Sequence, residues 1–468
     1  MTTTIEAFGH RLRARELTSA QVTEECLARI RADNERLNAF ILVMADEARR
    51  QADEMDRELA GGRDRGPLHG VPISIKDIID IRGVPTTAAS RVREGHVAMR
   101  DAPSIAHLRQ AGAVFVGKTN LHEFAFGATN EDSAFGPARN PHDPTRSPGG
   151  SSGGSGASVA AGMALASIGT DTGGSIRIPA AACGIVGLKP TLGEISTDGV
   201  VPLSRTMDHV GPLTQSVADA SLVYHALLGD AHALPPAPMP LHGLRLAVPR
   251  KYFCDLLDDE VGAQFEAALG RLRAGGVHVD EITIQHAADI APIYLHIVLS
   301  DAAAYHATTL ETMGDRYTPN VRSRLELGRH ILAEDYVRAL AGRNLLRREV
   351  DAALAQHDAL VLPTLPIPAP VVGASTVQVG KTTELVRNAM LRLTQLFDVS
   401  EHPAIAIPAG RTSAGLPCSV QLVGCRGQTD ALLRVALACE AALRELPVAR
   451  VEGPQITSGP SPLGNVGG

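Results

Sequence analysis

The sequence lacks paired cysteines. Its six cysteines form no CxxC motif and are scattered at Cys26, Cys183, Cys254, Cys418, Cys425 and Cys439. This spacing argues against a disulfide framework and against a zinc knuckle. We therefore expect buried free thiols and no metal ion.

The sequence also lacks an excess of positive charge. Its 44 basic and 51 acidic residues give a net charge of -7. Such a chain has no basic field to attract a phosphate backbone or anionic lipid, so we expect neither nucleic acid nor membrane as a partner. The first twenty residues contain no apolar core of a secretory signal, which favours the cytoplasm. No segment resembles a transmembrane span, because the longest uncharged run, which contains Ser147–Gly162, is rich in glycine and serine.

Helical and strand patterns alternate along the chain. "TSAQVTEECLARI", with Ser19 or Thr18 as N-cap, and residues 44–59 have helical spacing. "GVPISIKD" alternates as a strand does and places Lys76 on the less apolar face. "SIAHLRQAGAVFVGKTN" predicts a helix, a glycine stop and a buried strand. This order favours an α/β protein with a largely parallel central sheet.

The second half of the chain continues this pattern. "LRLAVPR", "HDALVLPT", "AIAIPAG" and "CSVQLVG" predict strands, and residues 259–274, 335–356 and 428–446 predict helices. The proline-rich "DAHALPPAPMPLHG" between the halves predicts a long surface loop or a joint within one domain. With 44% hydrophobic residues, 468 residues can bury a large core.

The run "SPGGSSGGSGASVAAG" at Ser147–Gly162 allows a backbone to pass close to a ligand or another segment. It contains neither a phosphate-loop motif nor GxGxxG. It does contain GxSxG at Gly149, Ser151 and Gly153, the pattern of a nucleophile elbow. Prolines, not an apolar strand, precede that serine, so the short motif alone is open to chance.

A second segment, "ASIGTDTGGSIRIPAAACGIVGLKPT", predicts a strand ending near Ile168, a tight loop over 170–174 and a helix from Ser175. Backbone N–H groups in such a loop could form an oxyanion hole for acyl transfer. The donors would be Thr172, Gly173, Gly174 and Ser175. The alternative is that Ser175 is an N-cap without chemistry.

These segments together resemble the amidase signature family of serine hydrolases. The resemblance rests on "GVPISIKD", "GGSSGGSGASVAAG" and "GTDTGGSIRIPAAACGIVGLKPT" in that order, and it extends from about Leu17 to Leu446. It implies an α/β fold with a large mixed central β-sheet, covered by helices on both faces, in a single large domain without a cofactor. We expect an N-terminal helical segment over 1–60, the amidase signature domain over 61–450 and a disordered tail over 451–468.

The resemblance implies a Ser–cis-Ser–Lys triad. Ser175 would be the nucleophile, Ser151 the bridging serine after a cis peptide bond, and Lys76 the base. Lysine can accept a proton only when neutral, which at pH 7 costs about 4.6 kcal/mol unless burial lowers its pKa. A proton would pass from Ser175 through Ser151 to Lys76 and return to the leaving amine.

The resemblance also implies residues around the triad. Loop-holding partners would be Ser152, Ser155, Asp171 and Arg177, with a structural ion pair to a nearby carboxylate as the favoured role of Arg177. The substrate-binding residues would be Ala125, Phe126, Gly127 and Ser151. For Phe126 the alternative is ordinary core packing.

The implied activity is hydrolysis of the C–N bond of small neutral amides, aryl or arylalkyl, through an acyl-enzyme that could also serve esters and carbamates. "VVPLSRTMDHVGPLTQSVADA" and "LHGLRLAVPRKYF" are more similar to bacterial indoleacetamide and mandelamide hydrolases than to other branches. A small-molecule amide is thus the expected partner, and a homodimer is left open.

Two other functions stay open. The first is the glutaminase (A) subunit of a tRNA-dependent amidotransferase, where the position of Arg343 can hold a substrate carboxylate, although we expect Arg343 to be an exposed helix residue and "RTMDHVGP" departs from that pattern. The second is a catalytically silent scaffold, which would be marked by a missing triad residue. None is missing.

Overall fold

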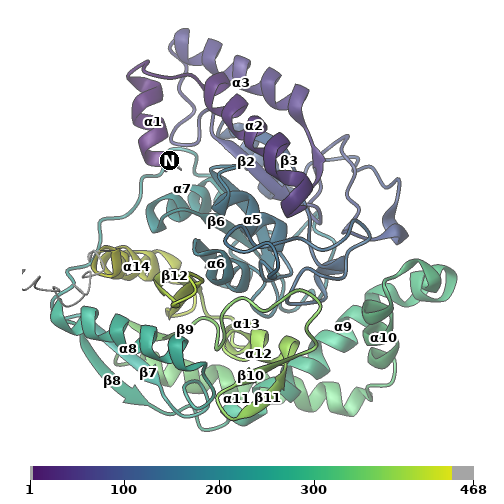
Figure 1. The fold of residues 1–468 in the computed structure, drawn as a ribbon, viewed down its shortest axis with the longest axis vertical. Helices are drawn as coiled ribbons and strands as arrows, with labels where there is room; N and C mark the ends of the chain where they lie inside the picture. Colours follow the sequence, from purple (N-terminus) through teal and green to yellow (C-terminus); the bar gives the residue numbers. More distant parts are fainter. Residues whose placement is uncertain (1–3, 445–468) are drawn as a thin grey trace, which may run out of the picture.

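A mixed β-sheet forms the centre of the fold (Figure 1). The computed structural model describes residues 4–444, and within them eleven strands form this sheet. In sheet order the strands are β1 (Phe40–Val43), β3 (Val114–Thr119), β2 (Pro72–Lys76), β4 (Ala166–Asp171), β6 (His209–Thr214), β5 (Val186–Lys189), β12 (Ala404–Arg411), β13 (Pro417–Val423), β9 (Ala359–Pro363), β7 (Arg245–Pro249) and β8 (His278–Ile282). A separate hairpin consists of β10 (Thr376–Val379) and β11 (Thr382–Leu385).

Strand direction varies across the sheet. β2 is parallel to β3 and β4, and β7 is parallel to β8 and β9. The other neighbours, from β1 with β3 to β13 with β9, are antiparallel. The largely parallel sheet expected from helix–strand alternation is therefore wrong, and the mixed sheet implied by the family resemblance is confirmed.

Helices cover both faces of the sheet (Figure 1). On one face lie α7 (Val217–Leu228), α14 (Thr429–Arg444) and α8 (Asp259–Ala274), with α1 (Ile5–Arg13) and α4 (Pro103–Gln110) beside α7. On the other lie α2 (Ser19–Leu37), α3 (Ala45–Ala60), α5 (Gly153–Ala160) and α6 (Arg177–Cys183). The remaining helices are α9 (Ile290–Met313), α10 (Pro319–Gly328), α11 (Ala333–Leu354), α12 (Val386–Leu391) and α13 (Gln395–Val399). Short 3-10 turns are η1 (Arg91–Arg93), η2 (Glu123–Ala125), η3 (Ala287–Asp289) and η4 (Gly314–Arg316).

The sequence patterns predicted most of these elements. The predicted strands before and after residue 400 appear as β7, β9, β12 and β13, and the helix predicted over 259–274 is α8. α2 begins with a capping box in which the Thr18 side chain and Gln21 each bond the other's backbone N–H. The proline-rich stretch after α7 forms the expected loop.

The N-terminal segment that was expected to be helical contains a strand of the central sheet. Residues 1–60 are not purely helical, because β1 pairs antiparallel with β3 and makes this segment part of the central sheet. The boundary at residue 60 stays a prediction. The predicted disordered tail over 451–468 lies outside the described residues.

α9 differs from what the sequence led us to expect about membranes. The helical stretch Ala287–Arg316 is long and apolar enough to cross a bilayer by length and composition, whereas we expected no such segment. In the fold this helix packs against α10, α11 and α13 and buries Ile290, Ile297 and Ala302. A helix that is apolar on several sides is also typical of the core of a large protein.

The cysteines form no disulfide between residues 4 and 444. Four are buried, but Cys254 and Cys425 are only partly covered, so the expectation of buried thiols holds for four of the six. In the same part of the chain, no three His, Cys, Asp or Glu side chains are grouped closely enough to hold a metal ion.

Gly154→Ala should destabilise the protein. A Cβ on Gly154, in α5, would lie 2.4 Å from Ala39 O and 2.5 Å from Asn120 O, and backbone atoms cannot move aside at low cost. We expect a loss of about 1–3 kcal/mol, seen as a lower Tm in thermal unfolding followed by circular dichroism. The control is Gly270→Ala in α8, where a Cβ meets nothing and alanine should raise Tm or leave it unchanged. Equal Tm values for the two variants would contradict this account of the packing.

Candidate active site

The candidate site lies where three parallel strands end. β3, β2 and β4 are neighbours in the sheet and finish at Thr119, Lys76 and Asp171. Parallel strands bring their carboxyl ends to one edge, where crossover loops can gather side chains from distant parts of the sequence. Figure 1 shows α5 and α6 near this part of the sheet.

Lys76 is fully buried at this edge. Its Nζ donates to Ser151 Oγ at 2.8 Å and to Thr170 Oγ1 at 2.7 Å. Burial lowers the pKa of Lys76 to about 7, although the carboxylates of Asp171 and Asp208 act in the opposite direction. A large share of Lys76 is therefore neutral near pH 7, as a base requires.

The glycine-serine run places Ser151 against this lysine. The Gly150–Ser151 peptide bond is cis, and a Cβ on Gly150 would lie 2.7 Å from Asn130 N, so only glycine lets the two segments approach so closely. Ser152, at the start of α5, donates its backbone N–H to Ser175 O at 3.3 Å. The run thus brings Ser151 to Lys76 and its neighbour Ser152 to Ser175.

Ser152 and Ser155 hold the run on the sheet. Ser152 Oγ donates to Thr170 O at 3.2 Å, and Ser155 Oγ lies 2.8 Å from Thr119 Oγ1. Both contacts attach α5 to strand ends beside Lys76. Among the described residues, no hydrogen bond joins the hydroxyls of Ser151 and Ser175, so a relay between them requires rotation of a hydroxyl-bearing side chain.

The turn that carries Ser175 is folded around a carboxylate. Asp171 Oδ1 accepts from Gly174 N at 2.6 Å, and its Oδ2 accepts from Ile176 N at 3.2 Å. The sequence placed the strand end near Ile168 and the helix start at Ser175. Both boundaries are wrong: β4 continues to Asp171, which pairs with His209, and α6 begins at Arg177.

This turn presents three of the four predicted oxyanion-hole donors. Gly174 N–H already donates to Asp171, which removes it from the set. Within residues 4–444 the backbone N–H groups of Thr172, Gly173 and Ser175 have no acceptor. A site with free N–H groups beside a serine can stabilise a developing oxyanion.

Arg177 forms buried ion pairs with two carboxylates. Its Nε lies 3.0 Å from Asp171 Oδ2, and its Nη2 lies 2.6 Å from Asp398 Oδ2. Burial opposes ionisation of Asp171, but the Arg177 guanidinium holds the pKa of that carboxyl well below its usual range. Burial and the charge of Asp171 raise the pKa of Asp398. The favoured structural role of Arg177 agrees with these contacts.

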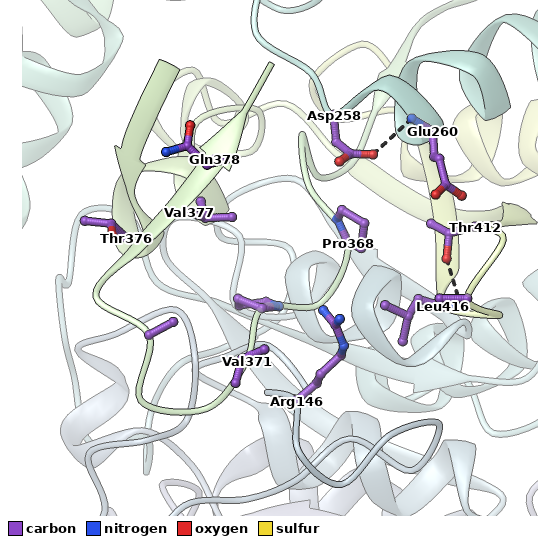
Figure 2. A pocket seen from close by; sticks show the side chains of 13 residues that line it. Arg146, Asp258, Glu260, Pro368, Val371, Thr376, Val377, Gln378, Thr412 and Leu416 are labelled. Carbon is purple, nitrogen blue, oxygen red and sulfur yellow. Dashed lines mark hydrogen bonds between the residues drawn. The ribbon is translucent and has the colours of Figure 1, made fainter. Parts of the chain in front are cut away.

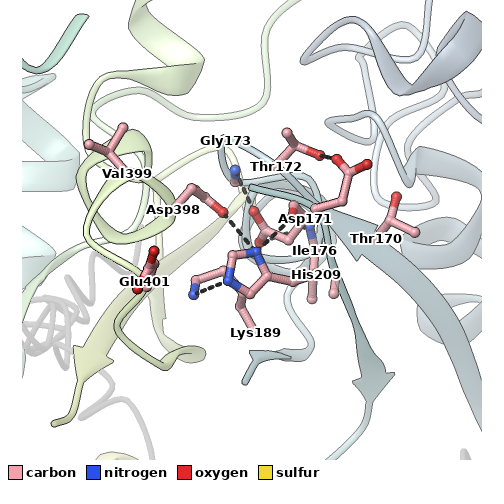
Figure 3. Close-up of polar contacts among 12 residues, drawn as sticks. Thr170, Asp171, Thr172, Gly173, Ile176, Lys189, His209, Asp398, Val399 and Glu401 are labelled. Carbon is pink, nitrogen blue, oxygen red and sulfur yellow. Dashed lines mark hydrogen bonds and ion pairs between the residues drawn. The ribbon is translucent and has the colours of Figure 1, made fainter. Parts of the chain in front are cut away.

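A second layer lies behind Asp171 (Figure 3). His209 Nδ1 lies 3.1 Å from Asp171 O, and Lys189 Nζ lies 3.2 Å from His209 Nε2. Lys189 Nζ also donates to His402 O at 2.6 Å. Burial lowers the pKa of Lys189 to about 8, and burial followed by the charge of Lys189 lowers the pKa of His209. These contacts hold the backbone carbonyl of Asp171.

Two residues beside the site escaped the sequence analysis. Thr170 accepts from Lys76, and Asp208 accepts from Thr172 Oγ1 at 2.6 Å. Burial raises the pKa of Asp208 to about 6. Both stand inside the motifs "GTDTGGS" and "RTMDHVGP", but only the strand register brings Thr170 to Lys76 and Asp208 to Thr172.

The predicted acyl-pocket residues lie in the loop after β3. Ala125 has a positive φ of 59°, and Phe126 is buried in the main core, which agrees with the packing alternative for that ring. Phe126 O accepts from Arg324 Nη1 at 2.5 Å. Gly127 lies against His122, because a Cβ there would meet the imidazole at 2.1 Å.

Arg343 is not the exposed helix residue that we expected. It is 7% exposed, and its guanidinium donates to Val399 O at 3.1 Å and Thr206 O at 2.9 Å and pairs with Glu401. The spacing of Arg347 and Arg348 suggested a solvent face, but α11 turns this position toward α13. Its Nε and Nη2 donors are occupied by protein groups, which agrees with a structural role.

A well-formed cavity elsewhere contains none of these residues. It has a volume of about 430 Å³ and lies between β10, the start of α8 and the turn after β12 (Figure 2). Arg146, Glu260 and Thr412 are among the residues that line it. The candidate site is therefore defined by its side chains and not by this cavity.

Comparison with known proteins gives consistent matches. Residues 21–433 match the Amidase family. An amidase of Pseudomonas putida is 39% identical over 94% of this chain and 96% of its own length, and a glutamyl-tRNA(Gln) amidotransferase subunit of Roseiflexus sp. (strain RS-1) is 39% identical over 90% and 92%. A crystal structure of an amidase superposes with a TM-score of 0.89 at 37% identity, over 94% of this chain and all of that one.

Asp171→Asn should destabilise the protein more than Asp398→Asn. Both oxygens of Asp171 accept N–H donors, so an asparagine amide would face one of them, whereas Asp398 Oδ1 has no hydrogen-bond partner among residues 4–444. We expect a loss of about 3–5 kcal/mol for Asp171→Asn and about 1 kcal/mol for Asp398→Asn, measured as Tm. Equal losses would show that Asp171 does not organise the turn.

Proposed function

Since the chain belongs to the amidase signature family of amidohydrolases, we propose that it cleaves the C–N bond of small amides with Ser175 as the nucleophile. The single observation that carries this proposal is a buried Lys76 with a pKa near 7, in hydrogen-bond contact with Ser151 beside the Ser175 turn. Free serine is a weak nucleophile and needs such a base.

In the proposed reaction, Ser175 Oγ attacks the amide carbon and its proton passes through Ser151 to Lys76. The carbonyl oxygen, now negative, is held by the free N–H groups of the turn. The C–N bond then breaks, the proton returns to the leaving amine, and an acyl group stays on Ser175. Water next attacks this ester with Lys76 again accepting the proton, the C–O bond to Ser175 breaks, and the acid leaves as the proton returns through Ser151 to Ser175 Oγ.

Thr172 and Asp208 position the oxyanion donors in this scheme. Asp208 accepts from Thr172 Oγ1 and from the backbone N–H groups of Leu203 and Ser204, so the turn is attached to the loop before β6. Thr394 Oγ1 donates to Gly173 O at 2.6 Å and fixes the opposite side of the turn. Pre-arranged donors stabilise charge without reorganising during the reaction.

A glutaminase subunit is the second candidate. The relative from Roseiflexus is as similar to this chain as the Pseudomonas amidase is, so overall identity does not separate the two functions. Arg343, the residue considered for a glutamine carboxylate, is occupied by Glu401 and two carbonyls. This favours an amidase that acts without a partner chain.

Other properties complete the proposal. We keep the cytoplasm as the location and a homodimer as the assembly to test first. The aryl or arylalkyl nature of the substrate stays a prediction from the family resemblance. A silent scaffold is disfavoured, because the lysine and both serines are present and near one another.

Ser175→Ala should abolish amide turnover. Removing the nucleophile of a serine hydrolase costs a factor of about 10⁴ or more in kcat. The measurement is ammonia or amine release from arylacetamides, an anilide, an aryl carbamate and glutamine by the purified chain alone. Ser196→Ala, at an exposed serine, is the matched control and should keep full activity. Unchanged turnover in Ser175→Ala would refute the mechanism, and turnover of glutamine alone would favour the glutaminase function.

The activity should rise with pH through about 7. Lys76 is active when neutral, so kcat/KM should fall about tenfold per pH unit below 7 and level off above it. Asp208, whose pKa is raised to about 6, titrates in an overlapping range. Because the Asp208 charge raises the pKa of Lys76, Asp208→Asn should keep the limb and shift it to lower pH, even if the rate drops. A flat profile between pH 5 and 7 would exclude Lys76 as the base.

A further inference from the structure

A cavity apart from the Ser175 turn lies between four segments of the chain (Figure 2). Its volume is about 430 Å³, and its walls come from Arg146, the start of α8, the segment 368–378 and the turn after β12. Cavities of this size with mostly apolar walls and a few polar groups are typical of sites for small molecules. Lys76, Ser151 and Ser175 do not line it.

Opposite charges face this cavity without pairing with one another. Arg146 lines it together with the carboxylates of Asp258 and Glu260, and Figure 2 shows the Arg146 side chain directed toward Pro368. Among residues 4–444, Arg146 forms an ion pair with Asp143 alone, and Asp258 and Glu260 form none. A molecule that carries charges of both signs would complement all three groups.

The Arg146 guanidinium is held in place and keeps unused donors. Its Nη1 donates to Ala369 O at 2.6 Å, and its Nε lies 3.3 Å from Asp143 Oδ2. These contacts leave its Nη2 without an acceptor in the described part of the chain, and the side chain is 29% exposed. A fixed guanidinium with unused N–H donors suits a carboxylate.

The two carboxylates are fixed as well. Asp258 caps α8, and its Oδ1 accepts from Glu260 N at 3.0 Å and from Val261 N at 3.3 Å. Its Oδ2 has no donor within residues 4–444. Glu260 accepts from Ser413 Oγ at 2.9 Å, which holds that carboxylate against the turn after β12. An ammonium group has three N–H donors to offer such oxygens.

Apolar side chains make up much of the remaining wall. Pro368, Val371, Val377 and Leu416 line the cavity, and Val371 is 48% exposed. Contact with an apolar ligand would remove this surface from water. The occupant should therefore carry an apolar group as well as its two charges.

The cavity adjoins the glycine-serine run that carries Ser151. Arg146 directly precedes this run and forms an isolated antiparallel bridge with Val371. The next residue, Ser147, donates its backbone N–H to Pro370 O at 2.8 Å. A ligand on Arg146 would thus rest on the backbone segment that leads to the proposed active site.

We propose that this cavity binds a small apolar zwitterion, namely a free amino acid or a short peptide with apolar side chains. The carboxylate lies on Arg146, the ammonium on Asp258 and Glu260, and the apolar side chain against Val377 and Leu416. This binding site is additional to amide hydrolysis and does not depend on Ser175.

The first test compares ligands by calorimetry on the full chain carrying Ser175→Ala, which should not cleave them. L-Leucine and leucyl-leucine are compared with N-acetylleucine, which lacks the ammonium, and leucinamide, which lacks the carboxylate. We expect the zwitterion of fitting length to bind about tenfold more tightly, or better, than both analogues. No binding of either zwitterion at about 10 mM would overturn the inference, and so would equal binding of an analogue with one charge.

The second test removes the charge of Asp258. Asp258→Asn keeps a residue that caps helices well but carries no charge, so it should weaken binding of the preferred zwitterion about tenfold. Asp259→Asn, at the exposed neighbouring position outside the cavity, is the matched control and should leave the affinity unchanged. Equal losses in the two variants would indicate a general effect of charge and overturn the inference.

The third test concerns the carboxylate end and the location of the ligand. Arg146→Met should weaken binding about tenfold, and Arg146→Lys should keep part of the affinity. If Arg146→Met does not fold, the comparison of Asp258→Asn with Asp259→Asn still decides. The unmodified chain and Ser175→Ala should bind leucine with the same Kd. An affinity that changes in Ser175→Ala but not in the Arg146 or Asp258 variants would place the ligand at the Ser175 turn and overturn the inference.

Discussion

The Asp171 carboxylate is the interaction on which the rest of the site depends. It accepts N–H groups from the turn that carries Ser175, and it pairs with Arg177 at the start of α6. Arg177 in turn reaches Asp398, more than two hundred residues later in the chain. One buried charge therefore sets the turn and ties the first half of the sheet to α13.

The sequence predicted the parts of the site that lie within continuous motifs. Lys76, Ser151 and Ser175 stand in three such motifs, and the structure places Lys76 and Ser151 in contact. The sequence could not predict the roles of Thr170 and Asp208, because the contacts of these residues depend on which strands are neighbours in the sheet. Strand order is a tertiary property, and it also explains why helix–strand alternation wrongly suggested a largely parallel sheet.

The errors in boundaries have a common physical cause. The sequence rules treat glycines as the end of a strand and a serine as the start of a helix. Here β4 pairs with its antiparallel neighbour β6 as far as Asp171. The Asp171 carboxylate then holds the following turn, and α6 begins only at Arg177. Arg343 was misplaced for a similar reason, since the spacing of its neighbours on α11 carries no information about Glu401. Long-range partners overrode local preference in each case.

The residues that reach the site come from two separate parts of the chain. Lys76, Ser151 and Ser175 come from the first half of the chain, whereas Tyr294, against Gly173, and Arg324, which donates to Phe126 O, come from α9 and α10, beyond the proline-rich loop. The pairing of β5 with β12, the ion pair of Arg177 with Asp398 and the hydrogen bond from Thr394 to Gly173 O couple the halves. Substitutions in the later helices can therefore alter the surroundings of the Ser175 turn while Lys76 and both serines stay unchanged, which lets one scaffold diversify.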